Sequence, residues 1–277
     1  MDSTLTALAG QIAQLDAVDS AHLERMRHEA LTAQAPWKAE YGAYQSGGWW
    51  TTSLMNASGD AADVTIGDCA AKLTDLLGRM PATAAFLADL GLNFMWVRLA
   101  RLEGNAFLWE HRDYDELHQV ERHRLHVPLH TNRSAFLVTG GTKVHMTGGR
   151  IWRLTPTYAH GVCNLLGPDR IHLIADVYAD DAYQRLARRP ALSPAVAEPL
   201  PTADQNILAA RLESARNMAT LGYPEAAERM LLRLFYTYAL PEGTAYDLIA
   251  ELHTSLGDME AATRWETAKR RLLALPA

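Results

Sequence analysis

The chain has 277 residues, a formal net charge of −6 at pH 7, 48% hydrophobic residues and 21% charged residues. This composition is that of a globular protein with one large domain, or with one domain of roughly 200 residues and a smaller one. The acidic balance and the lack of a Lys/Arg run argue against a nucleic-acid partner.

The two cysteines and the first residues of the chain indicate in which cellular compartment the protein is expected. Cys69 and Cys163 lie far apart and outside any CxxC spacing, so we expect free thiols in a reducing environment. The start of the chain, MDSTLTALAG, carries an early aspartate and no basic segment, which does not fit a signal peptide. No apolar run reaches the ~18 residues that a membrane span requires. We therefore expect a soluble cytoplasmic protein with no membrane partner.

The predicted elements change in type along the chain. Residues 3–33 have apolar residues at helical spacing, which predicts one or two amphipathic helices. Residues 36–60 predict loop and a short strand, and residues 68–90 again have a helical pattern. From there to residue 178, short strands alternate with turn residues, which is typical of a sandwich or barrel. The expected strands are 94–102, 106–110, 123–129, 134–138, 143–146, 150–154, 160–165 and 170–178.

The last third of the chain is different. Residues 190–201 are rich in proline and are predicted to form a linker. Only helical patterns follow, and LGYPEAA at 221–227 recurs as LGDMEAA at 256–262, at a spacing close to that of helix–turn–helix repeats. We predict a β-domain over residues 1–189 with N-terminal helices, and a helical domain over residues 202–277. The helical domain is expected to pack on the β-domain, to form a homodimer or to bind a partner.

Three residues form the ligand pattern of a two-histidine, one-carboxylate metal site. His111 and Asp113 end an apolar, strand-like segment, and His160 follows a second one. This ligand set holds non-heme iron(II) and leaves positions open for substrate chemistry. A His-x-Asp pair alone also fits a surface loop with a salt-bridged histidine. A zinc-dependent hydrolase that uses the same three ligands is disfavoured, because Arg170 would have no role in such an enzyme.

Arg170 follows His160 as His-x9-Arg and opens an apolar strand, in which it shares a face with His172. A buried arginine needs an anionic partner, and a guanidinium can hold the distal carboxylate of 2-oxoglutarate through two parallel hydrogen bonds. Arg124 and His126 also share one face of a strand, which suits an anionic ligand if that face is interior. A solvent-facing position is the alternative for these residues.

The motifs HRDYDEL, RLHVPL and GRIWRL, followed by HGVCNLLGPDRIHLIADV, resemble the aspartyl/asparaginyl β-hydroxylase branch of the iron(II)/2-oxoglutarate dioxygenases. Within it, the chain is most similar to bacterial free-proline hydroxylases, over residues 36–275. The resemblance implies a mainly β core, a double-stranded β-helix of the jelly-roll or cupin-like kind. It also implies flanking N-terminal helices and a C-terminal helical domain.

The resemblance further implies the cofactors and the reaction. Such an enzyme hydroxylates an unactivated C–H bond with O2 while 2-oxoglutarate is converted to succinate and CO2. Fe(II) is then expected to be bound by His111, Asp113 and His160. The cosubstrate 2-oxoglutarate is expected to be bound by Arg170, with contacts from Arg124 and His126.

Two departures from the family pattern bear on the substrate. The eukaryotic members that modify proteins lack the carboxylate ligand, whereas this chain has Asp113, as the proline hydroxylases do. Arg150 and Arg153 stand where an acid and an aromatic residue are usual, which leaves an amino acid other than proline open. We predict hydroxylation of a free L-amino acid, either proline-like or basic or ureido such as arginine or citrulline, in natural-product biosynthesis.

A free amino acid needs a cation for its carboxylate and an acceptor for its ammonium group. The candidates for substrate contact are Arg98, Arg122, Asp115 and Trp152, with surface salt bridges and core packing as the alternatives. Two other functions stay open. One is hydroxylation of Asp or Asn residues in a peptide, and the other is a non-catalytic module that binds a metal or a partner.

Overall fold

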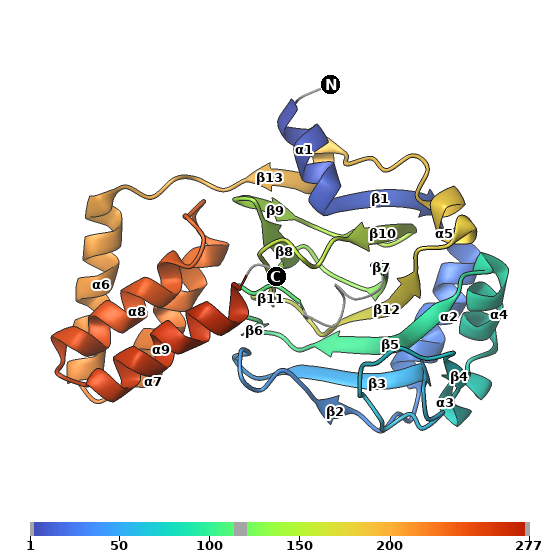
Figure 1. Ribbon diagram of the computed structural model, residues 1–277, viewed down its shortest axis with the longest axis horizontal. Coiled ribbons are helices and arrows are strands. Elements are labelled where there is room, and N and C mark those ends of the chain that lie inside the picture. The colour runs from blue at the N-terminus through green and yellow to red at the C-terminus, as the bar shows by residue number, and fades with distance from the viewer. Residues whose placement is uncertain (1–2, 114–120, 275–277) are drawn as a thin grey trace.

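The computed structural model describes residues 3–113 and 121–274, and it contains two facing antiparallel sheets with helices at both ends (Figure 1). The core is a jelly roll of the double-stranded β-helix type, which confirms the predicted fold class. Within these residues, no helix combines the length and the apolar character that a membrane crossing needs.

The larger sheet has the strand order β1-β10-β7-β12-β5-β3-β2, with β4 paired to β3. Its strands are β1 (Ile12–Ala17), β2 (Lys38–Ala39), β3 (Trp49–Asn56), β4 (Lys72–Leu73), β5 (Phe94–Leu102), β7 (Arg122–His130), β10 (Arg150–Leu154) and β12 (Arg170–Tyr178). Side chains alternate between the two faces of the central strands β7, β12 and β5. One face is apolar and includes Leu125, Leu173 and Leu99, while the other carries the basic residues.

Helices cover the apolar face of this sheet, at the right of Figure 1. They are α2 (Ser20–Thr32), α3 (Asp75–Gly78), α4 (Pro81–Leu90) and α5 (Asp181–Leu186). Met26, Leu77 and Tyr183 from these helices join the core under the sheet. Because this face is buried against helices, the basic face must point into the space between the sheets.

The smaller sheet has the order β13-β9-β8-β11-β6. Its strands are β6 (Ala106–Phe107), β8 (Ala135–Thr139), β9 (Thr142–Val144), β11 (His160–Asn164) and β13 (Ala197–Pro199). β11 lies between β8 and β6, so the strand that begins with His160 is central in this sheet.

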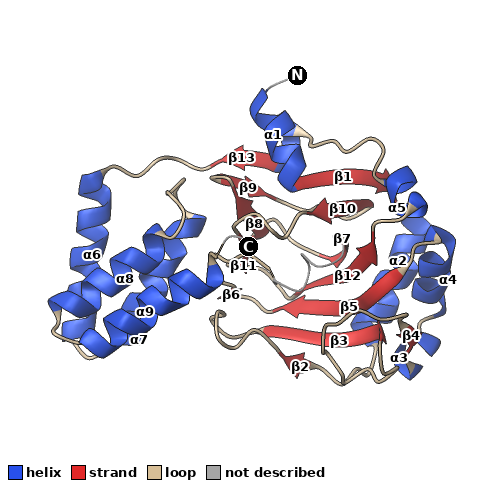
Figure 2. Ribbon diagram, viewed as in Figure 1, coloured by secondary structure: helices blue, strands red, loops and turns tan. Residues whose placement is uncertain are grey.

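The C-terminal helices form two hairpins beside the smaller sheet, at the left of Figure 2. The elements are α6 (Gln205–Thr220), α7 (Pro224–Leu232), η3 (Arg233–Tyr236), α8 (Thr244–Ser255) and α9 (Met259–Leu272). The repeated LG motif provides both hairpin turns, where Gly222 (φ 95°) and Gly257 (φ 79°) adopt the left-handed conformation that ends a helix. The predicted internal repeat is therefore a pair of helical hairpins.

Two segments differ from the sequence-based expectation. The region expected to be entirely helical contains α1 (Ser3–Gln11) and then β1, which pairs with β10 at the sheet edge. The segment expected to be a linker contains η2 (Pro194–Val196) and β13, which pairs with β9. Both strands lie next to partners that are distant in sequence, so local periodicity does not reveal them.

Candidate active site

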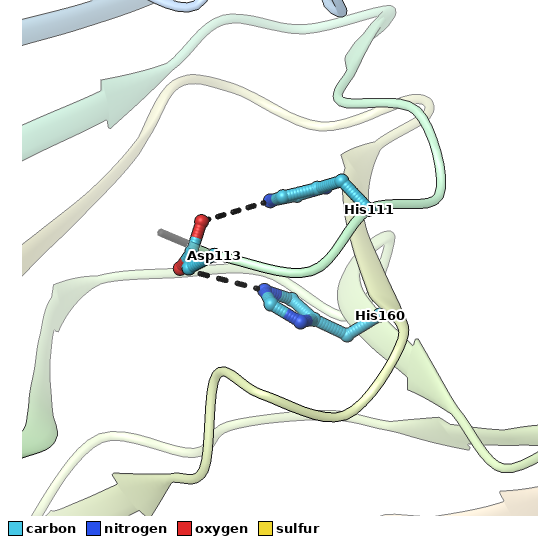
Figure 3. A group of neighbouring side chains, drawn as sticks. All are labelled: His111, Asp113 and His160. Carbon is cyan, nitrogen blue, oxygen red and sulfur yellow. Dashed lines mark ion pairs between the residues drawn. The ribbon is translucent and has the colours of Figure 1, made fainter. Parts of the chain in front are cut away.

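His111, Asp113 and His160 come together between the two sheets (Figure 3). One ligand atom from each residue lies within 4.8 Å of the other two, and all three residues are buried. His111 Nε2 lies 3.3 Å from Asp113 Oδ1, and His160 Nε2 lies 3.9 Å from Asp113 Oδ2. The structure thus assembles the predicted metal-binding set.

Backbone pairing explains why these side chains meet. His111 and His160 face each other in an antiparallel bridge, in which each amide donates to the carbonyl of the other, at 2.8 and 2.9 Å. The two rings consequently lie side by side, with centroids 4.5 Å apart. The amide of Asp113 donates to the carbonyl of Pro156 at 2.9 Å, which turns the chain so that its carboxylate faces both rings.

Hydrogen bonds fix the orientation of both imidazoles. Nδ1 of His111 donates to the carbonyl of Trp109 at 2.7 Å, and Nδ1 of His160 donates to that of Tyr158 at 2.9 Å. Each ring therefore turns its Nε2 toward Asp113, as metal-binding histidines do. Burial, together with the neighbouring His111, lowers the pKa of His160 to about 4, so this ring is neutral at pH 7.

The donor set fits a divalent cation. Two imidazole Nε2 atoms and a carboxylate that converge at one point can bind a divalent cation together. Burial alone would raise the pKa of Asp113, but Arg124 and the two histidines hold it below its usual range, so the carboxylate is ionised. Two imidazoles and one carboxylate are the ligands that Fe(II) requires in this class of site.

A second group of buried side chains fits an anion. Arg170 Nη2 donates to His172 Nδ1 at 2.7 Å, and His172 Nδ1 lies 3.5 Å from His126 Nδ1. Burial lowers the pKa of Arg170 to about 9, and burial together with this arginine depresses the pKa values of both histidines. In the described part of the chain, Arg170 Nη1, His126 Nε2 and His172 Nε2 have no hydrogen-bond partner. A dicarboxylate would supply both the charge and the acceptors that these atoms lack.

Buried ion pairs connect this strand face to the metal-binding set. Asp176 Oδ2 accepts from Arg98 Nη1 at 2.6 Å, and Asp176 Oδ1 accepts from Arg124 Nε at 2.7 Å. Arg124 Nη1 also contacts Asp113 Oδ2. Asp176 and Arg124 are direct cross-strand neighbours on β12 and β7, so sheet register sets this contact. The network orders Arg124 beside the carboxylate that would bind the metal.

A cavity of about 30 Å³ lies between these groups. The predicted residues that line it are His111, Asp113, His160, Arg170, Arg124, His126 and Arg98. Arg124 helps to close the cavity because its guanidinium reaches Asp113. A metal ion on the same carboxylate oxygen would require this guanidinium to turn away.

Two predicted substrate contacts lie elsewhere. Trp152 is fully buried among Leu8, Ile12 and other apolar residues, and its indole N–H donates to the carbonyl of Thr147. Arg122 contacts Asp68 and the sulfur of Met95. Trp152 therefore packs in the core, and Arg122 lies at the start of β7, two residues before Arg124, outside the cavity lining.

Two further residues, Asp115 and Arg153, entered the sequence-based expectations about the substrate. Asp115 lies outside the described residues. Arg153, which departs from the family pattern, donates to the backbone carbonyls of Ala9 and Gly10 at the end of α1. This arginine caps a helix and does not line the cavity.

Several residues at the site were missed by sequence reasoning. Asp176 continues the alternation of Arg170 and His172 along β12, so its position could have been found from the strand period. Tyr41 and Trp49 line the cavity, and the ring of Tyr44 lies 4.8 Å from that of His111. Tyr41 and Tyr44 come from an irregular segment, in which no period indicates direction, whereas Trp49 is the first residue of β3.

The helical tail holds the segment that carries His111. The hydroxyl of Tyr246 donates to the carbonyl of Glu110 at 2.5 Å, and the hydroxyl of Tyr236 donates to that of Leu108. The amide of Arg112 donates to the carbonyl of Leu272 at 2.8 Å. Trp265 also packs on Trp109, with ring centroids 4.7 Å apart. Helices α8 and α9 thus fix the backbone on both sides of a metal-binding residue.

A Tyr246→Phe substitution is expected to lower the free energy of unfolding by about 1–3 kcal/mol, because the carbonyl of Glu110 loses this buried donor. Metal affinity should fall by up to about tenfold, because the backbone before His111 is less constrained. Urea unfolding and metal titration measure the two effects. Tyr223→Phe, at an exposed tyrosine in the α6–α7 turn, is the control and should change neither. Equal behaviour of the two variants would contradict the role given to the tail.

A family model described as aspartyl/asparaginyl beta-hydroxylase matches residues 20–180, which is more than half of the chain. The chain belongs to the aspartyl/asparaginyl β-hydroxylase family. It is a 2-oxoglutarate-dependent oxygenase, with Fe(II) and 2-oxoglutarate as its cofactors. The predicted family is therefore confirmed.

Similar solved structures belong to several organisms. A 2OG-Fe(II) oxygenase family protein from Burkholderia pseudomallei has 15% identity and a TM-score of 0.41, covering 65% of this chain and 93% of that one. HygX from Streptomyces hygroscopicus, with nickel and 2-oxoglutarate bound, has 10% identity and a TM-score of 0.41, covering 64% and 87%. A Pseudomonas putida prolyl-4-hydroxylase has 14% identity and a TM-score of 0.38, covering 64% and 97%.

Proposed function

We propose that this protein hydroxylates a C–H bond of a free L-amino acid, either proline-like or basic or ureido. The main support is Arg98, a buried cation that lines the same cavity as the metal-binding set. The α-carboxylate of an amino acid would interact favourably with this guanidinium.

An acceptor for the ammonium group is available at Glu40. This carboxylate is half-buried, and it precedes Tyr41, which lines the cavity. Burial raises the pKa of Glu40, although Thr51 and the nearby arginines act in the opposite direction. Its Oε2 is buried and has no hydrogen-bond partner among residues 3–113 and 121–274. Glu40 and Arg98 would together match the two charges of a free amino acid.

The chain's own residues act by binding and positioning. His111, Asp113 and His160 would hold Fe(II), which together with 2-oxoglutarate supplies the oxidising power for oxygen insertion when bound. Arg170 would bind the distal carboxylate of 2-oxoglutarate, with His126 beside it and His172 orienting the guanidinium. Tyr41 and Trp49, as cavity walls, would exclude water from the reacting groups.

A second candidate is hydroxylation of an Asp or Asn residue within a peptide, which the description of the family model favours. A peptide substrate requires an open approach to the metal. The buried position of His111, Asp113 and His160 argues against it.

The test is succinate formation by protein loaded anaerobically with Fe(II) and then given O2 and 2-oxoglutarate. The panel contains proline, pipecolate, arginine, citrulline, lysine and aspartate, together with peptides that contain Asp or Asn. We expect one free amino acid to stimulate succinate formation. Arg170→Ala should remove that stimulation and weaken 2-oxoglutarate binding by about 2–5 kcal/mol, the loss typical of a truncated buried charge contact.

Arg101→Ala is the matched control. Arg101 lies on the neighbouring strand β5, and its guanidinium lies over Trp37, away from the cavity lining. Stimulation by peptides alone would support the second candidate and contradict the first. A wild-type protein that fails to bind 2-oxoglutarate would contradict both and favour the non-catalytic metal-binding module.

A further inference from the structure

A second cavity, of about 550 Å³, lies at the seam between the β-core and the helical tail. One wall is formed by Ser46, Asn105 and Phe107, which precede the metal-binding segment. The other wall comes from α6, α7 and η3. The volume falls within the range of small-molecule sites, about 300–1,000 Å³.

Three arginines line this cavity, and no carboxylate does so among the described residues. Arg211 comes from α6, Arg229 from α7 and Arg233 from η3. Across the two described stretches of the chain, none of the three forms an ion pair. Three like charges at one hollow repel each other, in a chain whose net charge is −6. An anion would remove this repulsion.

One of the arginines is held in place by the β-core. Arg233 Nη2 donates to the side-chain and backbone oxygens of Asn105, and its guanidinium lies over the ring of Phe107, 5.3 Å from the centroid. Asn105 adopts a positive φ of 65°, a conformation that is uncommon for residues other than glycine. The arginine is therefore positioned before any ligand binds.

The remaining lining combines apolar residues with the polar residues Ser46, Asn105 and Thr237. Phe107, Ala226, Met230 and Leu234 supply the apolar surface beside the three cations. A cavity with cations at one end and apolar residues on one side suits an organic molecule that carries a compact dianionic group. Phosphate offers three equivalent acceptor oxygens and a charge near −2, which match several guanidinium groups better than one carboxylate does.

We propose that this cavity binds a small phosphate-bearing organic molecule, at a site separate from the catalytic cavity. The two cavities share no lining residue. The proposal does not depend on which substrate the enzyme hydroxylates.

The test is calorimetric titration of the full-length protein, saturated with 2-oxoglutarate and a redox-inert divalent metal, in buffer free of phosphate. The probes are inorganic phosphate and phenyl phosphate. We expect saturable binding of both, with phenyl phosphate binding more tightly because its ring reaches the apolar wall. An Arg211→Gln/Arg229→Gln variant should weaken phenyl phosphate binding by at least ~10-fold, the equivalent of about 1.4 kcal/mol. Both positions are exposed, so this variant should fold normally.

Arg25→Gln/Arg270→Gln is the matched control, because it removes the same charge from exposed positions outside the cavity. It should bind phenyl phosphate within twofold of the wild type. Arg233→Gln should weaken binding as well, whereas Arg170→Ala should not. The proposal is overturned if the wild type shows no saturable binding, if both double variants weaken equally, or if Arg170→Ala abolishes binding. A phenyl phosphate affinity no higher than that of inorganic phosphate would overturn the organic part of the proposal.

Discussion

An Asp113→Asn variant is expected to lose Fe(II) affinity by ~100-fold or more and to lose turnover with it. Removing a group that only supports a metal ligand already costs about 10–100-fold, and Asp113 would be a ligand itself. The amide has nearly the same shape as the carboxylate but no charge, so the two histidines would be left as the main donors. Metal titration and succinate formation measure the two losses.

The control for this variant is Asp169→Asn, at a half-exposed aspartate in the turn before β12. It should leave metal affinity and turnover unchanged. Wild-type metal affinity in Asp113→Asn would show that the carboxylate is not a ligand, and the two-histidine, one-carboxylate assignment would then fail.

An Asp176→Asn variant is expected to lower the free energy of unfolding by about 3–5 kcal/mol. Asp176 is almost fully buried and pairs with Arg98 and Arg124, so its neutral replacement removes a negative charge that both guanidiniums share, although Arg124 keeps its contact with Asp113. Urea unfolding at pH 7 measures the loss. Asp247→Asn removes an exposed pair with Lys269 and should cost at most about 1 kcal/mol.

The stability difference between wild type and Asp176→Asn is expected to depend on pH. Burial alone would raise the pKa of Asp176, but Arg124 and Arg98 hold it below its usual range in the folded protein. A lowered folded-state pKa contributes stability that is complete above the unfolded value of about 3.9 and is lost as the pH falls below it. The difference between wild type and Asp176→Asn should therefore shrink below about pH 4. A constant difference down to pH 2 would contradict the ion-pair explanation.

Sequence reasoning found most of the core because strand periodicity is a local signal. The expected strands at 94–102 and 170–178 coincide with β5 and β12. The alternation that places Arg124 and His126 on one face is confirmed, since both line the catalytic cavity. Their apolar neighbour Leu125 packs on the opposite face with the helices.

The sequence-based predictions were wrong where a segment pairs or packs with another segment that is distant in sequence. Ile12 begins β1 because its backbone pairs with β10. The spacing between Leu8 and Ile12 also suits a helix. Trp152 belongs to an apolar cluster to which α1 contributes Leu8 and β1 contributes Ile12. Neither the pairing of β1 nor the packing of Trp152 can be predicted from the pattern of a short stretch of sequence.

The structure brings together the predicted residues whose charge had to be buried, whereas sequence reasoning did not find the residues of the irregular walls. The metal-binding set and Arg170 each require a partner in the interior, which makes their pattern informative. Tyr41, Tyr44 and Glu40 lie in a segment without regular period, and their approach to the site depends on how that segment folds back onto β3 and the chain after β6.

The contact between Arg112 and Leu272 has a consequence for the order in which the protein assembles. All three metal ligands precede β12, yet the backbone amide of Arg112, next to His111, donates to the carbonyl of Leu272 in the last turn of α9. Contacts between segments so distant in sequence form late, because the intervening chain must first be confined. During synthesis the ligands therefore emerge well before the structure that secures them. A chain cut before α9 would keep all three ligands but would lack the partner for the amide of Arg112.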